Sequence, residues 1–211
     1  MSRKHAGRGR PPRLRTLIVC EGEKTEPYYL NEFKRLDDVR RWRDVKIVAG
    51  RGGLRQQVVE RAVKEQSRRE YDEVFCVLDT EAQDSPEAVD DLRRSIERAE
   101  LEDIRLVLSN PSFEVWLIAH FERTSRRFSG GADAVRCVDD WFRRRFARSY
   151  DKADRTLFST LKTRLPEALA NAHAVREHDH GTFDGVEKCN SCTTVDELLT
   201  HLRLPLRRPP P

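Results

Sequence analysis

Four short apolar segments, separated by stretches of helical periodicity, constrain the fold of this 211-residue chain more than any other feature. They lie at residues 16–20, 45–49, 74–78 and 104–108, and each is about as long as a strand and rich in Val, Ile and Leu. Continuous apolar runs of this length are typical of parallel strands buried on both faces of a sheet. The repeated strand–helix order therefore predicts an α/β, Rossmann-like fold, in which right-handed crossovers place helices on both faces of a parallel sheet.

Helix signals fill the gaps between these segments. Tyr29 and Phe33 share one face after residues 26–27, and Ser85 followed by Pro86 is typical of an N-cap and a first helical position. Further helices are predicted after residues 52–53, from 110–111 through 121, and at about 132–147, 155–175 and 194–202.

The length fits one domain, or a domain with an appended subdomain. Residues 1–13 and 203–211 are rich in Pro, Gly and Arg without periodicity, which predicts disordered tails. Residues 14–122 contain all the predicted strands and form the predicted α/β domain. Residues 123–202 are predicted to form a helical C-terminal region.

Composition excludes several classes of protein. Only 37% of the residues are hydrophobic and 36% are charged, and the longest apolar runs are far shorter than the ~20 residues of a membrane helix. The N-terminus shows no apolar core of a signal peptide. We therefore expect a cytoplasmic protein without a membrane partner. Because the number of cysteines is five, an odd count, a disulfide framework is not expected.

The charge is unevenly distributed, although the net value is only +4. The first fifteen residues carry six Lys or Arg and no acid, which suits contact with a polyanion such as nucleic acid. A second basic group, Arg143, Arg144 and Arg145, alternates with aromatic residues between 141 and 150. It predicts either a nucleic-acid-binding face or an amphipathic helix whose aromatic side chains are core and whose arginines are solvated.

Polar residues follow the predicted strands at one edge of the sheet. Glu21 follows the first strand, Asp79 and Glu81 follow the third, and Asn110 and Glu114 follow the fourth. Ligands of open parallel sheets bind beyond the carboxyl ends of the strands. Because alternation points Asp79 and Glu81 to the same side, the pair suits a shared divalent cation such as Mg²⁺. The alternative is that each acid caps the following helix or faces water.

Several of these segments together resemble a known family. "LIVCEGEKTEPYYL", "VFCVLDTE" and "LSNPSFEVWLIAHF" resemble the RloB family, whose core is similar to the Toprim domain. The later "SYDK", "PEALANAHAV" and "NSCTTVDELL" also fit, so the resemblance covers about residues 14–202. It implies that Glu21 is the catalytic acid/base and that Asp79 and Glu81, with Glu21, hold Mg²⁺ or Mn²⁺. The sequence departs from the D-x-D pair of Toprim proteins, because Glu81 replaces the second Asp.

The same resemblance implies a function. A Toprim-like protein of this family is expected to be a metal-dependent nuclease that cleaves RNA, including tRNA, or DNA in anti-phage defence and abortive infection. The resemblance also implies a partner, an ABC-type or AAA-type ATPase encoded nearby. This chain has no G-x-x-x-x-G-K-[ST] loop, so nucleotide hydrolysis is expected to come from that partner. Supporting roles in the site are expected for Glu26, Asn110, Glu114 and Lys152.

Two weaker motifs allow more than one interpretation. "GRGG" at residues 50–53 is either a tight turn or a phosphate cradle, with Arg51 and Arg55 as the phosphate contacts. His178, His180, Cys189 and Cys192 have spacings compatible with zinc, but the family resemblance favours a turn in which the cysteines are incidental.

Two other functions remain open at this stage. A phosphoacceptor or phosphatase-like domain also gathers acids around Mg²⁺ at strand ends, and it would need a nucleophilic Asp79 but not Glu81. A non-catalytic interaction module of an ATPase-containing complex is the other, since Glu81 departs from the metal-binding pattern.

Overall fold

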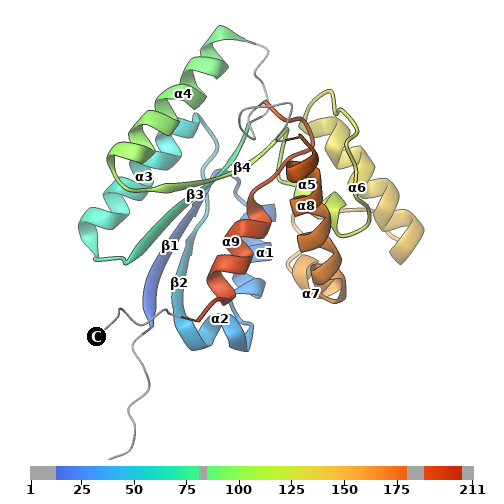
Figure 1. Cartoon of the computed structure of the whole chain (residues 1–211), viewed down its shortest axis with the longest axis horizontal. Helices are drawn as coiled ribbons and strands as arrows, with labels where there is room; N and C mark the ends of the chain where they lie inside the picture. Colours follow the sequence, from blue (N-terminus) through green and yellow to red (C-terminus); the bar gives the residue numbers. More distant parts are fainter. Residues whose placement is uncertain (1–12, 81–84, 180–187, 206–211) are drawn as a thin grey trace, which may run out of the picture.

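The computed structural model describes residues 13–80, 85–179 and 188–205, and it confirms the predicted α/β fold (Figure 1). The sheet consists of four parallel strands in the order β2-β1-β3-β4. The strands are β1 (Leu14–Cys20), β2 (Arg43–Val48), β3 (Glu73–Asp79) and β4 (Arg105–Ser109). Each differs from its predicted range by three residues or fewer at either end, and all four apolar segments form strands.

Helices cover both faces of the sheet (Figure 1). On one face lie α3 (Arg55–Arg68) and α4 (Pro86–Leu101), which bury Val59, Ala62 and Ala99 against Leu17, Cys76 and their neighbours. On the other lie α1 (Thr25–Phe33) and α9 (Val195–Arg203), in a larger cluster that includes Ile18 and Phe75. Since successive strand residues point to opposite faces, β1 and β3 contribute to both clusters, as their unbroken apolar runs predict.

The start of α4 follows the predicted capping pattern. The Ser85 side chain accepts a hydrogen bond from the Ala88 backbone N–H at 3.2 Å, and Pro86 occupies the first helical position. A proline has no N–H to leave unpaired there, so this sequence starts a helix cleanly.

Three helix predictions need correction. A short helix, α2 (Asp37–Trp42), has too few residues to show a periodicity and was not predicted. The predicted helix through residue 121 is shorter, α5 (Glu114–Ala119). The predicted helix 155–175 is divided into α7 (Leu157–Leu161), a 3-10 turn (Lys162–Arg164) and α8 (Leu165–Asp179). Pro166 accounts for the division, because a proline fits the first turn of a helix and interrupts an interior.

The C-terminal segment packs on the α/β layers. Helix α6 (Gly131–Phe146) and helix α8 contact α5, whereas α9 returns to β4 and α2. Side chains of the α/β layers and of the C-terminal helices therefore share one hydrophobic cluster, which includes Ile18 and Leu202. The predicted division at residues 122–123 stays a prediction about domain organisation. Both predicted tails lie largely outside the described residues. Among the described helices, none is long and apolar enough to cross a membrane.

Candidate acidic site at the carboxyl ends of the strands

The two central strands bring Glu21 and Asp79 together. Strands β1 and β3 are hydrogen-bonded neighbours, and the chain leaves them toward opposite edges of the sheet, β2 on one side and β4 on the other. This is the topological switch point at which open α/β sheets bind ligands. Glu21 directly follows β1, and its Oε2 accepts a hydrogen bond of 3.0 Å from the backbone N–H of Asp79, the last residue of β3.

Two glycines allow the backbone to come close to these acids. The Gly22 N–H donates to Glu26 Oε1 at 3.1 Å, and a Cβ at Gly22 would lie only 2.2 Å from Glu26 Oε2. Gly50 donates its N–H to the Gly22 carbonyl oxygen at 2.9 Å, and a Cβ at Gly50 would lie 1.6 Å from the Glu21 carbonyl oxygen. Any side chain at Gly50 would therefore displace Glu21.

An open pocket of about 310 Å³ lies above these strand ends. Its charged lining residues are five acids and two lysines: Glu21, Glu23, Glu26, Asp79, Glu114, Lys24 and Lys152. Gly22, Thr25, Gly52, Gly53 and Phe113 complete the lining. The pocket is therefore formed by the segments that follow β1, β2, β3 and β4, together with one residue of the helical C-terminal region.

Glu21 has the most informative electrostatics in the pocket. Its pKa is raised from 4.5 to about 7, mainly by burial and also by the charges of Glu26 and Asp91, which together outweigh the lowering effects of the Asp79 N–H and Arg55. A carboxyl group with a pKa near neutrality exchanges protons readily at physiological pH. This property suits a general acid or base.

Glu114 is the centre of a buried polar cluster. It is 2% exposed, and it accepts hydrogen bonds from Ser112 at 2.7 Å and from the Tyr150 hydroxyl at 3.1 Å. Its Oε1 also lies 3.1 Å from the Lys152 ammonium. Burial and the Glu114 charge raise the pKa of the neighbouring Glu26. The "SYDK" segment thus supplies Tyr150 and Lys152 to a site whose other residues lie between positions 21 and 114.

Arg55 and Asp91 were not predicted to pair. Arg55 is buried, its Nε donates to the Asp79 carbonyl oxygen at 2.5 Å, and its guanidinium lies 3.3 Å from Asp91. Asp91 also accepts the backbone N–H groups of Arg55 and Gln56, which are the first of α3. The predicted phosphate contact by Arg55 is therefore wrong, because its side chain is directed into the protein.

The structure separates other predicted residues from the pocket. Arg51 is exposed and is not among the lining residues. Gly52 and Gly53 have φ values of +70° and +114°, a conformation that favours glycine and agrees with the tight-turn interpretation of "GRGG". Asn110 also lies outside the lining, and its backbone pairs with residues 191 and 192. Glu81 lies outside the described residues, so its predicted metal contact stays a prediction.

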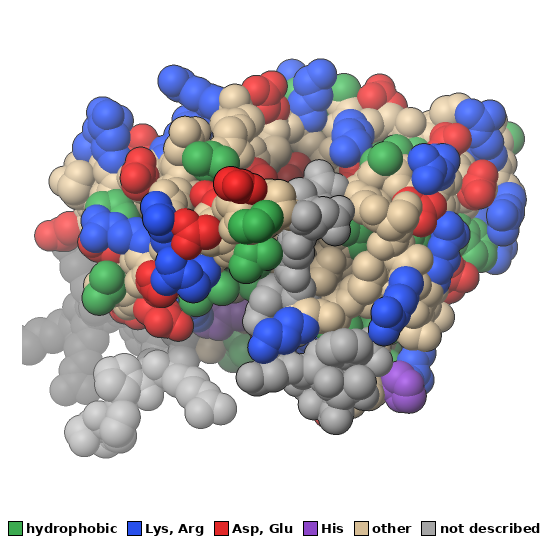
Figure 2. Space-filling model, turned by 90° about the horizontal axis from the view of Figure 1, so that it is seen from above, with side chains coloured by type: hydrophobic (Ala, Val, Ile, Leu, Met, Phe, Trp, Pro, Cys, Tyr) green, Lys and Arg blue, Asp and Glu red, His purple; other side chains and the backbone are tan. Residues whose placement is uncertain are grey.

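The predicted basic residues of α6, Arg143, Arg144 and Arg145, are surface residues outside the pocket lining. Arg143 and Arg144 pair with the acids four residues earlier, at 2.7 and 4.0 Å, and Arg144 and Arg145 lie over the Trp141 ring. Phe142 is fully buried, as the amphipathic-helix interpretation requires. Figure 2 shows basic and acidic side chains interspersed over the upper face of the molecule. Nucleic-acid binding by these arginines stays a prediction.

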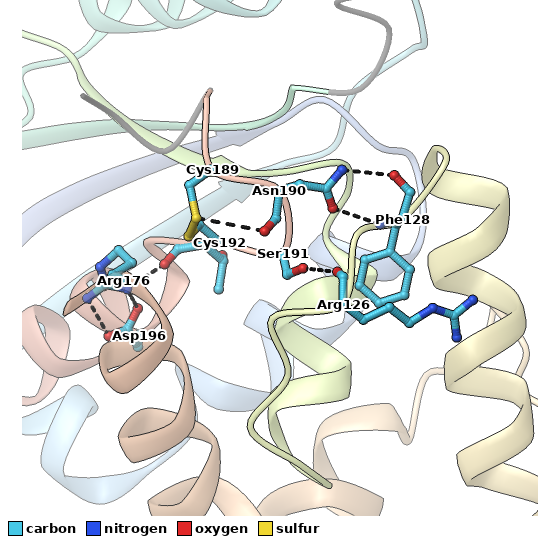
Figure 3. The surroundings of a disulfide bond; sticks show 9 residues. Arg126, Phe128, Arg176, Cys189, Asn190, Ser191, Cys192 and Asp196 are labelled. Atoms are coloured by element: carbon cyan, nitrogen blue, oxygen red, sulfur yellow. Dashed lines mark hydrogen bonds and ion pairs between the residues drawn. A yellow bond between two sulfur atoms is a disulfide. The ribbon is translucent and has the colours of Figure 1, made fainter. Parts of the chain in front are cut away.

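Cys189 and Cys192 form a disulfide, which was not expected (Figure 3). The turn brings their Cα atoms to 5.5 Å, a separation typical of disulfides, whereas an odd count of cysteines says nothing about one local pair. The turn is fixed by Asn190, which hydrogen-bonds the Phe128 backbone, and by Ser191, which donates to Arg126. Disulfide sulfurs are not thiolate ligands, so the zinc interpretation loses support. His180 lies outside the described residues.

The pocket fits a divalent cation only in part. Asp79 and Glu21 supply carboxylate oxygens, the ligands that Mg²⁺ prefers, at neighbouring strand ends. Within the ranges that the structure describes, however, no group of three or more His, Cys, Asp or Glu is close enough to hold a metal. A third carboxylate would have to come from outside these ranges, where Glu81 lies two residues beyond Asp79.

Comparison with known proteins identifies one relationship. A family model described as RloB-like protein matches residues 16–202, which is most of the chain. Searches of the curated proteins and of the solved structures found no match.

Proposed function

Since the chain belongs to the RloB-like family, we propose that it is a Mg²⁺-dependent nuclease that hydrolyses nucleic-acid phosphodiester bonds at the acidic site. The observation that carries the proposal is the convergence of Glu21 and Asp79 at the switch point of the sheet, where the Asp79 backbone N–H donates to the Glu21 carboxylate at 3.0 Å. Two further buried carboxylates, Glu26 and Glu114, line the same pocket. Carboxylates gathered in this way repel one another, and a hard cation relieves the repulsion.

The residues of the site have separate roles in this proposal. Glu21 would either transfer a proton during hydrolysis or complete the metal site; its pKa of about 7 in the metal-free protein suits the first role. Asp79 and Glu81 would hold Mg²⁺, which when bound would stabilise negative charge on the reacting phosphate. Glu114 positions Tyr150 and Lys152 at the edge of the pocket.

The wider role is inferred from the family resemblance alone. A nuclease effector of anti-phage defence that is controlled by a separate ATPase agrees with a chain that has no nucleotide-binding loop of its own. RNA, including tRNA, and DNA are both candidate substrates.

A non-catalytic interaction module is the second candidate. It is favoured by one observation, namely that the described residues contain no preformed set of three metal ligands. No observation on the described residues specifically favours a phosphoacceptor domain: the backbone N–H of Phe113 donates to Asp79 Oδ1 at 2.8 Å, and this contact is compatible with either a metal-binding or a nucleophilic Asp79.

Thermal melting and cleavage assays test the proposal together. At ~10 mM Mg²⁺ and a Kd of ~1 mM, binding to the folded state adds about 1.4 kcal/mol, which raises the melting temperature by roughly 3–5 °C. We expect this response in the wild type and in Glu23→Gln, a matched control in the same pocket, and its loss in Asp79→Asn. Glu21→Gln should abolish cleavage of labelled RNA or DNA, and Glu81→Asp should retain it.

Two results would contradict the nuclease proposal. One is a full metal response in Asp79→Asn, and the other is undiminished cleavage by Glu21→Gln. Either would place the chemistry elsewhere and favour the interaction module.

A further inference from the structure

The pocket has a basic rim on the side of α1 and the "SYDK" segment. Lys24 and Lys152 are the two lysines among the lining residues, and both are exposed. Arg155 follows three residues after Lys152, and its guanidinium carbon lies 4.9 Å from the centre of the Tyr28 ring. Tyr28 is one turn along α1 from Lys24, to whose carbonyl oxygen its N–H donates at 2.9 Å. We call these four residues, Lys24, Tyr28, Lys152 and Arg155, the basic rim.

The position of Lys152 in this rim is fixed by its backbone. The Thr25 hydroxyl donates to the Lys152 carbonyl oxygen at 3.3 Å. Two residues earlier, the Tyr150 N–H donates to Asp139 at 2.8 Å and the Tyr150 hydroxyl donates to Glu114. Contacts from α1, α5 and α6 therefore hold this segment over the pocket.

The Lys152 ammonium can bind an anion while it remains paired with Glu114. An ammonium has three N–H donors, and Glu114 Oε1, at 3.1 Å, accepts from one of them. The Lys152 side chain is 56% exposed, whereas the Glu114 side chain is only 3% exposed. The remaining N–H donors are thus accessible from the open pocket. There they can offset the repulsion between a phosphate and the neighbouring carboxylates.

Tyr28 and Arg155 offer a different contact from that of the lysines. An aromatic ring and a guanidinium plane both stack on nucleobases, and such stacking needs bases that are not already stacked in a duplex. The Tyr28 ring is partly exposed and Arg155 is exposed. The rim therefore combines cations for phosphates with a stacking surface for one unpaired base.

We propose that the basic rim binds single-stranded nucleic acid, with Lys152 on the phosphate next to the acidic site and the Tyr28–Arg155 pair on a neighbouring base. The inference deepens the proposed nuclease function and rests on it for the direction of the strand into the pocket. Within the rim, Lys24 and Lys152 line the pocket and Tyr28 and Arg155 adjoin them, whereas the predicted basic residues Arg51, Arg143, Arg144 and Arg145 are not lining residues.

Fluorescence anisotropy with labelled 20-nucleotide RNA and DNA tests the rim. All variants are made in the Glu21→Gln background, so that binding is measured without cleavage. We expect Lys152→Ala and Arg155→Ala each to weaken single-strand binding by about 5- to 10-fold, and Tyr28→Leu by at least about 5-fold. Lys152→Ala should also reduce the slope of log K against log salt by about 0.7. Lys64→Ala removes the same charge from an exposed position on α3 and should change affinity by less than about twofold.

Matched probes and a cleavage assay separate the possible failures. The Tyr28→Leu effect should be absent with a blunt duplex of the same length, and an equal effect would overturn the single-strand assignment. Single-strand binding by the double variant Lys152→Ala/Arg155→Ala that equals binding by Lys64→Ala would overturn the rim, provided that both melt like the parent protein. The rim variants are also made with Glu21 restored, so that their cleavage can be measured. If they cleave like wild type while Glu21→Gln does not cleave, the rim is rejected and the nuclease is retained. Loss of binding in the rim variants, with no cleavage by wild type, would reject the nuclease and retain the rim.

Discussion

Replacing Glu21 by Gln should stabilise the metal-free protein, and the gain should depend on pH. Burial raises the pKa of Glu21 from 4.5 to about 7 in the folded state, so the folded protein holds this proton more tightly than the unfolded chain. As the pH rises from about 4.5 to 7, the folded state must either keep the proton or bury the charge, and stability falls. The penalty is complete above the folded-state pKa, and Gln removes it while its amide oxygen still accepts the Asp79 N–H.

The size of the effect follows from the pKa difference. At about 1.36 kcal/mol per pKa unit, the penalty at pH 8 is about 3 kcal/mol as an upper bound, because Glu21 keeps some contact with solvent. At pH 5 the same calculation leaves less than about 1 kcal/mol. Glu21→Gln should therefore melt about 6–10 °C above wild type at pH 8, and within about 3 °C of it at pH 5.

Urea denaturation in EDTA measures the free energy of unfolding of wild type and Glu21→Gln at pH 5 and pH 8, with Glu23→Gln as the control. Glu23 lines the same pocket but is exposed, so its replacement should leave stability nearly unchanged at both pH values. A Glu21→Gln variant that gains equally at pH 5 and pH 8, or that is destabilised at pH 8, would refute the electrostatic description of the site.

Two further predictions concern the backbone around the site and the disulfide. Gly50→Ala should destabilise the protein by roughly 2–4 kcal/mol and reduce activity, because its Cβ would overlap the Glu21 carbonyl. The control Gly52→Ala meets no atom within 4 Å, so it should lose only about 1 kcal/mol, the cost of an alanine in the left-handed conformation. Urea denaturation measures both losses. Replacing Cys189 and Cys192 by Ser should lower the stability by about 2 kcal/mol, the chain-entropy value for closing a four-residue loop. The double variant should then be as stable as wild type reduced with dithiothreitol. Stoichiometric zinc in wild type by elemental analysis, lost in the double variant, would show instead that the cysteines bind metal.

The strand ends could be predicted from the sequence because their signals are local. Four apolar segments of strand length define parallel strands, and the geometry of such a sheet then places Glu21 and Asp79 at one edge. The Ser85–Pro86 start of α4 was readable for the same reason, since a cap depends on a few adjacent residues.

The rest of the site depends on tertiary packing. Arg55 and Asp91 are far apart in sequence, and nothing in either helical pattern indicates that one would pair with the other at the start of α3. Tyr150 and Lys152 reach Glu114 only because the turn after α6 packs over α1 and α5. A family resemblance indicated Lys152, but no local rule could have identified Glu114 as its partner.

The return of α9 to the sheet has a consequence for the order in which the protein is made. All four strands are synthesised by residue 109, yet the last helix covers β4 and places His201 against Phe75 of β3. Until that helix emerges, part of one sheet face has no apolar cover, and the α/β layers cannot complete their core. We therefore expect a nascent chain that ends before residue 195 to remain incompletely folded, so that the acidic site is assembled only after α9 has been synthesised.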